Sequence, residues 1–538
     1  MKIGIDFDNT IANYDNAFKS VAIENKLVPK EWHGTKSSLK KKIIEKHSII
    51  EWQKLQGQVY GRFINKAKLF NGLKRFLVRC SIENHEVYII SHKTQYGHFD
   101  SMNINLRSAA LNWMKNQQFF NKDFINIDAK KIFFLNTQKK KINKIKNLNL
   151  DLMIDDLPEI FENKITKNIT TILFRNKSNK TCIVDFKFKS WWEIENFALG
   201  IPRNSTIASL ADLLLSNEKI VHFKKINESG NSSVYQLETD FKNKYALKQY
   251  PSPFLDKKKR LATEIMATKL LLKTGLSPVP HKWDKDLNIA IFHWIEGSHI
   301  NNIIDNHFYK LCEFTKILWM MSSNLNLKVP YAAESCRSYI DLCNQIDKRL
   351  NQLLLIENLK LNNFLVEEFQ PLLNKTKKFS LENWPANNIN RDLDRKFLIL
   401  SPSDFGFHNA LQLTNSDIKF IDFEYFGLDD PVKLISDILW HPAMKITQKQ
   451  KSLCTKLLLN IFQEDNFIKK RLNAAFSLYG LRWALIILNE FLPKKWLIRV
   501  HANEDKNSKK EIIFLKQLKK ASTICKEITA NNMEFKYD

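Results

Sequence analysis

Short apolar runs alternate with longer helical patterns over the first part of the chain. Runs rich in β-branched and aromatic residues predict strands over 2–7, 87–90, 132–135, 152–154 and 169–174. A mostly helical stretch lies over 11–70, and a further helix is predicted over 73–80. Short strands separated by helices are typical of a parallel sheet that helices cover on both faces. The pattern therefore predicts an α/β domain.

The pattern changes after 196–205, where Gly200, Pro202, Asn204 and Ser205 indicate a boundary. Beyond it we predict paired strands over 234–237 and 245–248, an amphipathic helix over 258–273, a helical stretch over 302–373, a strand hairpin over 410–424 and closing helices. A small sheet followed by a larger helical lobe is an α+β arrangement. We place the two domains at 1–200 and 201–538, with a small lobe at about 205–297 and a larger one at about 298–538.

Composition excludes several classes of protein. The 37 Phe and 12 Trp among 538 residues argue against disorder. No apolar run approaches the roughly 18 residues that a membrane helix needs, so no membrane association is expected. Seven cysteines without a CxxC pair predict neither a disulfide framework nor a zinc site. The chain opens on a predicted strand and not on a secretory signal, and we expect a reduced, cytoplasmic protein.

The net charge of +26 raises nucleic acid as a partner. Lysines are scattered along the whole chain, however, and no basic stripe is interleaved with aromatic residues, which disfavours nucleic acid. The cationic balance suits anionic small molecules. The sequence contains neither GxGxxG nor GxxxxGK[ST], so the commonest dinucleotide fold and the P-loop kinases are excluded.

Carboxylates follow two of the predicted strands in the first domain. Asp6 and Asp8 come directly after the first strand, where ligands bind in parallel sheets. One carboxylate can attack phosphorus, and the other can protonate the leaving oxygen. Asp155 and Asp156 follow the strand at 152–154 and are candidate Mg²⁺ ligands. Ser91 follows the strand at 87–90 and offers a hydroxyl to a phosphate oxygen.

A lysine that holds the phosphate charge is expected before the second acid pair. Lys141 lies on a helix whose apolar side carries Ile145. Lys140 and Lys144 are alternatives to it.

These motifs, in this order, resemble the haloacid dehalogenase (HAD) superfamily of phosphatases, which carries DxDx[TV], then Ser/Thr, then Lys, then DD at successive strand ends. The resemblance covers about 195 residues and implies a Rossmann-like α/β domain with a small helical cap at about 11–70. It also implies a role for each residue: Asp6 the nucleophile, Asp8 the acid/base, Thr10, Ser91 and Lys141 the phosphate site, and Asp6, Asp8, Asp155 and Asp156 the Mg²⁺ site.

The sharper cluster in the second domain is SPSDFGFHN, followed by a strand that runs into IDFEY. Asp404 and Asn409 are five positions apart in a loop, and Asp422 ends the following strand. This spacing resembles the kinase-like phosphotransferases, in particular the aminoglycoside phosphotransferase and choline kinase branch. The resemblance implies a bilobal protein-kinase-like fold, with Asp404 accepting the substrate hydroxyl proton while Asn409 and Asp422 hold Mg²⁺.

Upstream positions agree with this resemblance in order and spacing. A loop around Ser229 and Ser233 is expected to cradle ATP phosphates, Lys248 to touch them, and Glu264 to orient that lysine. The segment that begins at Ile291 is expected to form the hinge between the two lobes, whose backbone holds the adenine ring. The ATP-binding residues implied are Gly230, Asn231, Ser232, Lys248, Glu264, Trp294 and Ile295.

One position departs from the family. Pro402 stands where these enzymes usually carry a histidine that braces the catalytic loop. His408 lies inside the loop and is either a substitute brace or structural. Asp437 is expected to serve the larger lobe structurally.

The leading hypothesis is a bifunctional cytoplasmic enzyme that uses Mg²⁺ and ATP. A phosphatase acting on a small phosphate ester would be fused to a kinase acting on a hydroxyl-bearing sugar or amino alcohol. The string IDFEY resembles the corresponding segment of choline and ethanolamine kinases, which favours an amino-alcohol substrate. The basic net charge of the chain disfavours a polycationic drug as substrate. Asp429, Asp430 and Glu490 are nevertheless available to make the local pocket acidic. Two alternatives stay open: an ATP-sensing pseudokinase beside the phosphatase, and a nucleic-acid end-processing protein.

Overall fold

The computed structural model describes residues 1–99, 102–162, 168–175, 184–226, 232–324, 326, 328–502 and 510–537. The chain divides into an N-terminal unit, Met1–Asn217, and a C-terminal unit, Glu218–Asp538. The boundary predicted at 200 falls between α7 (Trp191–Leu199) and α8 (Asn204–Leu215), both within the N-terminal unit. No helix in the described ranges is long and apolar enough to cross a membrane.

A six-stranded, wholly parallel sheet forms the centre of the N-terminal unit, in the order β5-β4-β1-β6-β7-β8. The predicted parallel sheet is therefore present, with strand β8 in addition. Its strands are β1 (Lys2–Ile5), β4 (Glu86–His92), β5 (Ile132–Leu135), β6 (Leu152–Asp155), β7 (Thr170–Phe174) and β8 (Phe186–Phe188).

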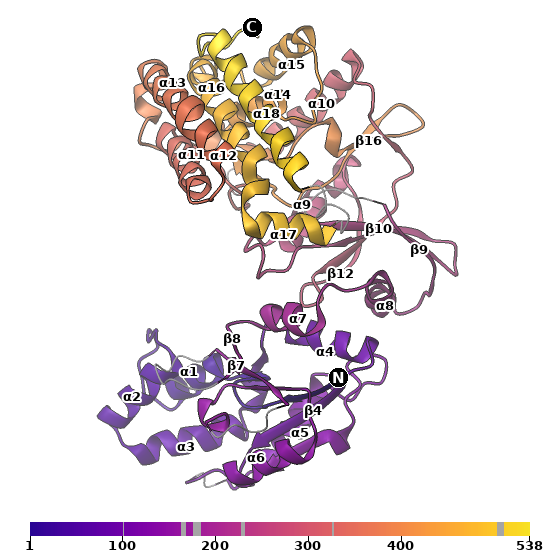
Figure 1. Ribbon diagram of the computed structural model, residues 1–538, viewed down its shortest axis with the longest axis vertical. Coiled ribbons are helices and arrows are strands. Elements are labelled where there is room, and N and C mark those ends of the chain that lie inside the picture. Colours follow the sequence, from indigo (N-terminus) through magenta and orange to yellow (C-terminus); the bar gives the residue numbers. More distant parts are fainter. Residues whose placement is uncertain are drawn as a thin grey trace. The chain divides into compact units, whose positions relative to one another are not determined.

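Helices cover both faces of this sheet (Figure 1). Leu173 packs with Ile145 of α6 (Gln138–Asn147) in one cluster. The next residue, Phe174, points to the opposite face and meets Trp191 of α7, which also packs on Phe76 of α4 (Leu73–Ile82). The alternation of buried residues along the strands thus supplies a core on each side. Helix α5 (Leu106–Asn116) lies in the connection between β4 and β5.

The predicted helical stretch at 11–70 forms a separate insertion. It contains α1 (Asp15–Glu24), α2 (Lys36–Lys46) and α3 (Ile49–Tyr60). Its two ends are joined by an antiparallel pair, β2 (Ala12–Asn13) with β3 (Lys68–Leu69). The insertion therefore leaves and re-enters the sheet domain next to the end of β1.

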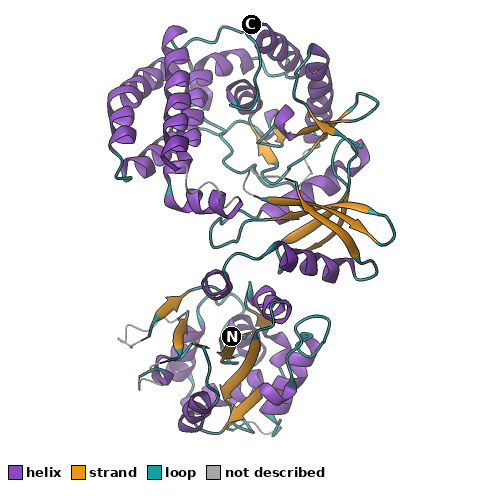
Figure 2. Ribbon diagram, turned by 45° about the vertical axis from the view of Figure 1, so that its right-hand side comes forward, coloured by secondary structure: helices purple, strands orange, loops and turns teal. Residues whose placement is uncertain are grey.

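The C-terminal unit begins with a five-stranded antiparallel sheet in the order β12-β13-β11-β10-β9 (Figure 2). Its strands are β9 (Ile220–Lys225), β10 (Ser233–Thr239), β11 (Lys244–Gln249), β12 (Pro280–Asp284) and β13 (Ile289–His293). Helix α9 (Arg260–Leu271) connects β11 to β12. The predicted paired strands and amphipathic helix lie within these elements.

The larger, helical part of this unit carries three short strand pairings near its loops. Five strands take part: β14 (Ser298–His299), β15 (Ile399–Ser401), β16 (Ala410–Gln412), β17 (Ile418–Phe420) and β18 (Gly427–Asp429). Strands β16 and β17 pair antiparallel as the predicted hairpin, and β15 pairs with β18. The helices are α10 (Asp305–Ser322), α11 (Tyr339–Leu354), α12 (Leu359–Asn363), α13 (Gln370–Asn383), α14 (Pro431–Trp440), α15 (Gln448–Ile461), α16 (Ile468–Ile487), α17 (Pro493–Ala502) and α18 (Lys510–Ala530).

The prediction of a continuous helical stretch at 302–373 is wrong between α10 and α11. Pro330 has no N–H and disfavours a helix before it. The segment instead runs beside β18, where the Ala332 N–H donates to the Leu428 carbonyl over 3.0 Å. This contact places the segment directly beside the loop that follows Asp422.

Candidate active sites

Three adjacent strands of the N-terminal unit bring the predicted phosphatase residues together. Asp6 follows β1, Ser91 lies near the end of β4, and Asp155 ends β6. Because β1 lies between β4 and β6 in parallel register, these side chains share the carboxyl edge of the sheet. The Asp6 N–H donates to the Ile154 carbonyl over 2.9 Å, which fixes the turn after β1.

Lys141 is the cation at the centre of this edge. Its Nζ lies 2.5 Å from Asp6 Oδ1 and 2.6 Å from Asp155 Oδ2, and its side chain is fully buried. Of the two alternatives from the sequence, Lys140 is exposed and Lys144 lies over the Phe133 ring. Lys141 is therefore the member of the lysine run that reaches the acids.

Asp8 is held by two residues that the sequence motifs did not reveal. Lys93 Nζ lies 2.9 and 3.0 Å from the two carboxylate oxygens of Asp8, and the Tyr14 hydroxyl donates to Oδ1 over 2.8 Å. Lys93 is two positions beyond Ser91, and residues two apart along a strand point to the same side of the sheet, so the sequence could have indicated that Lys93 lies near Ser91. Tyr14 comes from the insertion and had no such signal.

Two buried hydroxyls beside this cluster lack a hydrogen-bond partner among the described residues: Thr10 Oγ1 and Ser91 Oγ. Orphaned buried polar atoms are rare in native proteins and call for a ligand, water or ion. Both lie at the sheet edge where a phosphate oxygen would accept their hydrogen bonds. The pair therefore fits the phosphate site that the resemblance implies.

The acid cluster has the chemistry of a Mg²⁺ site. Asp6, Asp155 and Asp156 each place a carboxylate oxygen within 4.8 Å of the others. Burial, despite the opposing Lys141, raises the pKa of Asp6 to about 7, and burial with the charges of Asp6 and Asp155 raises that of Asp156 to about 8. Carboxylates this close need a cation to ionise together, and oxygen ligands are those that Mg²⁺ prefers.

The candidate kinase site is centred on Lys248, which ends up between three carboxylates. Its Nζ lies 2.7 Å from Glu264 of α9, 2.7 Å from Asp422 and 3.3 Å from Glu424. Antiparallel pairing places Lys248 in the middle of the sheet, and α9 brings Glu264 to it. Burial lowers the pKa of Lys248, but Asp422 and Glu264 raise it more, so that the amine stays charged.

A buried network holds these carboxylates in place. Glu264 also accepts from the Tyr250 hydroxyl over 2.8 Å. Glu424 accepts from the Ser232 hydroxyl over 2.8 Å and pairs with Arg260, which also pairs with Asp256. Glu424, Tyr250 and Arg260 were not singled out from the sequence, although Glu424 stands two positions after Asp422 in IDFEY.

Asp404 and Asn409 occupy one tight loop in this unit. Asn409 Nδ2 donates to the Asp404 carbonyl over 2.9 Å, so that its Oδ1 is left to bind a cation. Ser403, at φ 71°, takes the left-handed conformation before Asp404, and its hydroxyl accepts from Lys433 over 3.2 Å. Asp422, at φ 67°, has the same conformation. The loop is thus braced without a histidine at position 402.

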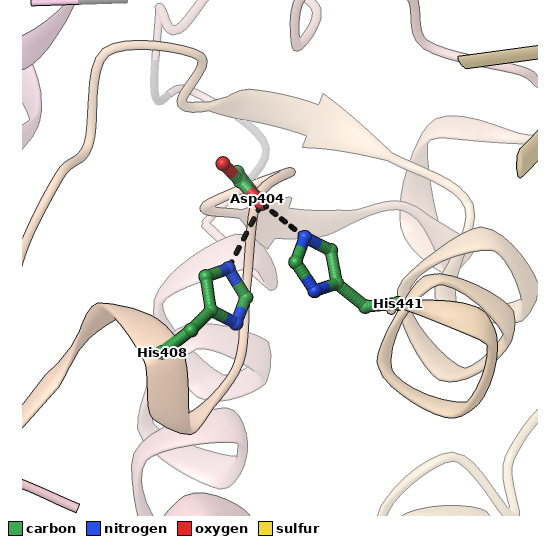
Figure 3. A group of neighbouring side chains, drawn as sticks. All are labelled: Asp404, His408 and His441. Carbon is green, nitrogen blue, oxygen red and sulfur yellow. Dashed lines mark hydrogen bonds and ion pairs between the residues drawn. The ribbon is translucent and has the colours of Figure 1, made fainter. Parts of the chain in front are cut away.

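Two histidines contact the Asp404 carboxylate (Figure 3). His408 Nε2 lies 3.1 Å and His441 Nε2 lies 3.3 Å from the same oxygen, Oδ1. Their rings stack with centroids 3.8 Å apart. Burial raises the pKa of Asp404, but the two hydrogen bonds outweigh burial and hold it well below its usual range. The second oxygen, Oδ2, is the one left to accept a substrate hydroxyl proton.

The Asp404, His408 and His441 atoms are close enough to hold a metal ion, but the surrounding hydrogen bonds argue against one. The Ala443 N–H donates to His441 Nδ1 over 3.1 Å, so the ring proton of a neutral His441 is on Nε2. A metal-bound histidine needs Nε2 free and its other nitrogen donating. The cluster is therefore a hydrogen-bonded brace of the carboxylate.

The remaining predicted ATP residues are distributed as follows. Ser232 is buried directly before β10. Trp294 and Ile295 follow β13 as half-buried residues in the connection to β14. Gly230 and Asn231 lie outside the described residues.

The acids proposed for a locally acidic pocket are structural. Asp429 pairs with Lys433 over 3.0 Å, Asp430 with Arg471 over 2.9 Å, and Glu490 accepts from Gln517 over 2.7 Å. All three are buried and have charged or polar partners, so none of them is free to make a substrate pocket acidic.

Asp437 has the structural role expected of it. Its carboxylate lies 2.9 Å from Lys433 Nζ and accepts from Trp483 Nε1 over 2.8 Å.

Six of the seven cysteines are buried and free, and Cys182 lies outside the described residues.

No protein-family model and no curated protein matches the sequence. Solved structures similar to the chain include choline kinase LicA from Streptococcus pneumoniae, at 15% identity and a TM-score of 0.36 over 56% of this chain and 94% of that one. Ethanolamine kinase from Plasmodium vivax is 13% identical, with a TM-score of 0.36 over 53% and 81%. Spectinomycin phosphotransferase in complex with ADP and spectinomycin is 14% identical, with a TM-score of 0.42 over 60% and 98%. Identities and TM-scores this low do not establish a function for this chain.

Proposed function

We propose that the C-terminal unit is an ATP-dependent kinase that phosphorylates a hydroxyl group of a small molecule, a sugar or an amino alcohol. The observation that carries the proposal is the buried Lys248 amine, held 2.7 Å from both Glu264 and Asp422. A strand lysine paired with a helix glutamate, beside an acid that follows a strand, is the arrangement that binds and orients ATP phosphates in kinase-like enzymes.

The residues support direct transfer of the γ-phosphoryl group. The substrate hydroxyl oxygen bonds to the γ-phosphorus while the bond from that phosphorus to the β–γ bridging oxygen breaks, and ADP leaves. Asp404 Oδ2 takes the hydroxyl proton, because both histidines occupy Oδ1. Lys248 offsets phosphate charge. Asn409 and Asp422 would hold Mg²⁺, which neutralises charge on the phosphates when bound.

A second activity, in the N-terminal unit, is favoured by the orphaned hydroxyls of Thr10 and Ser91 beside Asp6. We propose that this unit hydrolyses small phosphate monoesters. Asp6 bonds to phosphorus as the ester P–O bond breaks, and the leaving oxygen takes a proton from Asp8. Water then attacks that phosphorus and returns a proton to Asp8, and the Asp6–phosphorus bond breaks to release inorganic phosphate.

Label transfer tests the kinase in the full chain. An Asp6→Asn variant, which removes the proposed phosphatase, is given γ-labelled ATP, Mg²⁺ and a small-metabolite extract. Label is expected in a soluble compound and is expected to be lost when Asp404→Asn is added. Nucleotide binding without transfer would overturn the kinase in favour of an ATP-sensing pseudokinase, and label on an added oligonucleotide would favour end processing of nucleic acid.

Release of inorganic phosphate tests the second activity. The Asp404→Asn variant is expected to hydrolyse phosphate esters in the presence of Mg²⁺, and the further change Asp6→Asn is expected to abolish this. Hydrolysis that survives Asp6→Asn would exclude Asp6 as the nucleophile.

A further inference from the structure

A cavity of about 420 Å³ lies beside the acid cluster of the N-terminal unit. Asp156, which belongs to that cluster, and Asn9 line one side of the cavity. The insertion lines the other side through α2 and α3, and Trp52 of α3 is part of its wall. A phosphate ester whose phosphorus sits at Asp6 would extend its leaving group into this cavity.

Three basic side chains line the cavity: Lys36 and Lys40 from α2, and Arg175 after β7. Lys36 and Lys40 are four positions apart, so one helical face presents both. Arg175 already has a partner, since it lies 3.8 Å from Asp15. Lys36 and the exposed Lys40 are the basic residues of this lining that have no carboxylate within ion-pair distance among the described residues, although Asp15 and Asp156 also line the cavity.

The hydrogen-bond partners of Lys36 are neutral, although its charge also interacts with that of Asp156 in the same cavity lining. Its Nζ donates to Asn9 Oδ1 over 3.0 Å and to the Tyr60 hydroxyl over 3.1 Å, and it lies 4.4 Å from the centre of the Phe18 ring. Across the described parts of the chain, no carboxylate oxygen lies within 4 Å of the amine of Lys36 or Lys40. A half-buried amine with no carboxylate within ion-pair distance favours an anionic group in the adjoining space.

We propose that this cavity selects phosphate monoesters whose leaving group carries a second anionic group, either a carboxylate or a second phosphate. This inference rests on the phosphatase activity proposed above. Lys40 and Lys36 pair with that group while Asp6 faces the phosphate that is hydrolysed. A cationic leaving group, such as that of an amino-alcohol phosphate, is disfavoured at the same place.

The test compares four esters with the same carbon chain: butyl phosphate and its analogues with a terminal carboxylate, a terminal phosphate or a terminal ammonium group. With the full chain and Mg²⁺, kcat/KM is expected to be about tenfold higher for the two anionic analogues than for butyl phosphate. The ammonium analogue is expected to be the poorest. Which anionic analogue is better distinguishes phosphorylated acids from bisphosphates.

Neighbouring lysines on α2 supply the matched variants. Lys40→Gln is expected to reduce the ratio of anionic to neutral kcat/KM by roughly three- to fivefold. Lys41→Gln, whose side chain is 79% exposed and pairs with Glu45 over 3.7 Å, is expected to leave the ratio unchanged. Equal reduction by both variants would indicate a general charge effect and overturn the cavity assignment.

The two proposals fail differently. Hydrolysis of butyl phosphate as fast as that of the anionic analogues overturns the substrate class and leaves the phosphatase standing. Hydrolysis of none of the four esters, with phosphate release no faster than in Asp6→Asn, overturns the phosphatase and the inference that rests on it.

Discussion

Asp404 receives both histidine contacts on one oxygen, from residues that are far apart in the chain. His408 belongs to the loop itself, whereas His441 follows α14. The Ala443 N–H sets the tautomer of His441, so its Nε2–H points at the carboxylate. A residue outside the loop thus supplies the brace that Pro402 cannot, and His441 holds Asp404 through Oδ1, which leaves Oδ2 for the proposed substrate.

The role of His441 predicts a specific kinetic defect. His441→Leu removes the donor and is expected to lower kcat by roughly ten- to a hundredfold, because a hydrogen bond to a charged group is worth about 1.5–3 kcal/mol. KM for ATP is expected to be unchanged. His441→Gln keeps an N–H donor and is expected to recover most of kcat. Steady-state kinetics of the kinase measure this, and a rise in KM without loss of kcat would contradict a positioning role.

Sequence motifs located the candidate phosphate-binding residues better than the residues that hold those side chains in place. The contact between Lys248 and Glu264 was expected and is present, whereas Lys141 was expected to hold phosphate charge and its contact with Asp6 was not foreseen. Lys93 was within reach of the strand alternation but was missed. His441 had no local signal, because its contact with Asp404 depends on how α14 packs.

The sheet edge that carries Asp6, Asp155 and Asp156 concentrates negative charge in a buried place. Burial and the neighbouring carboxylates raise the pKa of Asp156 from 3.8 to about 8. Between about pH 4 and pH 8 the folded protein then binds a proton that the unfolded chain does not. Stability without metal therefore falls as pH rises through this window, by at most about 1.4 kcal/mol per pH unit.

Asp156→Asn removes the group that titrates. In EDTA, the melting temperature of the N-terminal unit is expected to fall less steeply between pH 5 and pH 8 in this variant than in the native chain. Mg²⁺ is expected to raise the melting temperature of the native chain most at high pH, where the carboxylates ionise, and less in the variant. Thermal melts across pH check both, and parallel slopes in the two proteins would contradict the shifted pKa.

Helix α14 carries a buried charge network beneath the catalytic loop. Lys433 is 1% exposed and lies 3.0 Å from Asp429 and 2.9 Å from Asp437. Lys433→Met leaves the buried Asp429 without its cation and Asp437 with Arg482 as its cation, and is expected to cost about 3–5 kcal/mol of unfolding free energy. Lys445→Met, at an exposed position after the helix, is expected to cost at most about 0.5 kcal/mol.

Urea denaturation measures the difference between these two lysine variants. Adding Asp429→Asn to Lys433→Met removes the uncompensated charge and is expected to recover much of the loss. A loss that the added change leaves untouched would mean that packing, and not charge, explains the cost.

At the level of elements, apolar periodicity predicted five strands of the parallel sheet to within a few residues but missed β8. Of the five antiparallel strands it predicted only β10 and β11. The half-buried edge strand β5 is a continuous apolar run, and the whole of it was predicted. The break between α10 and α11 was missed, because residues near Pro330 carry a helical pattern but gain a strand-like contact with β18 only in the folded unit.

On the scale of the whole molecule, each unit has clusters of buried apolar residues of its own. One joins Ile90, Ile145 and Leu173 in the N-terminal unit, and another joins Phe314, Phe405 and Phe476 in the C-terminal unit. Units with separate cores are expected to unfold separately. A ligand that binds one native unit stabilises that unit by mass action and has no reason to shift the other.

Calorimetry of the full chain is therefore expected to show two transitions. Mg²⁺ with a non-hydrolysable ATP analogue is expected to raise only one of them, by several degrees at saturating ligand, and Asp422→Asn is expected to abolish that shift. Mg²⁺ with inorganic phosphate is expected to raise only the other, and Asp6→Asn is expected to abolish it. A single transition that either ligand raises would mean that the two units unfold as one, and that a substitution at either site acts on both activities.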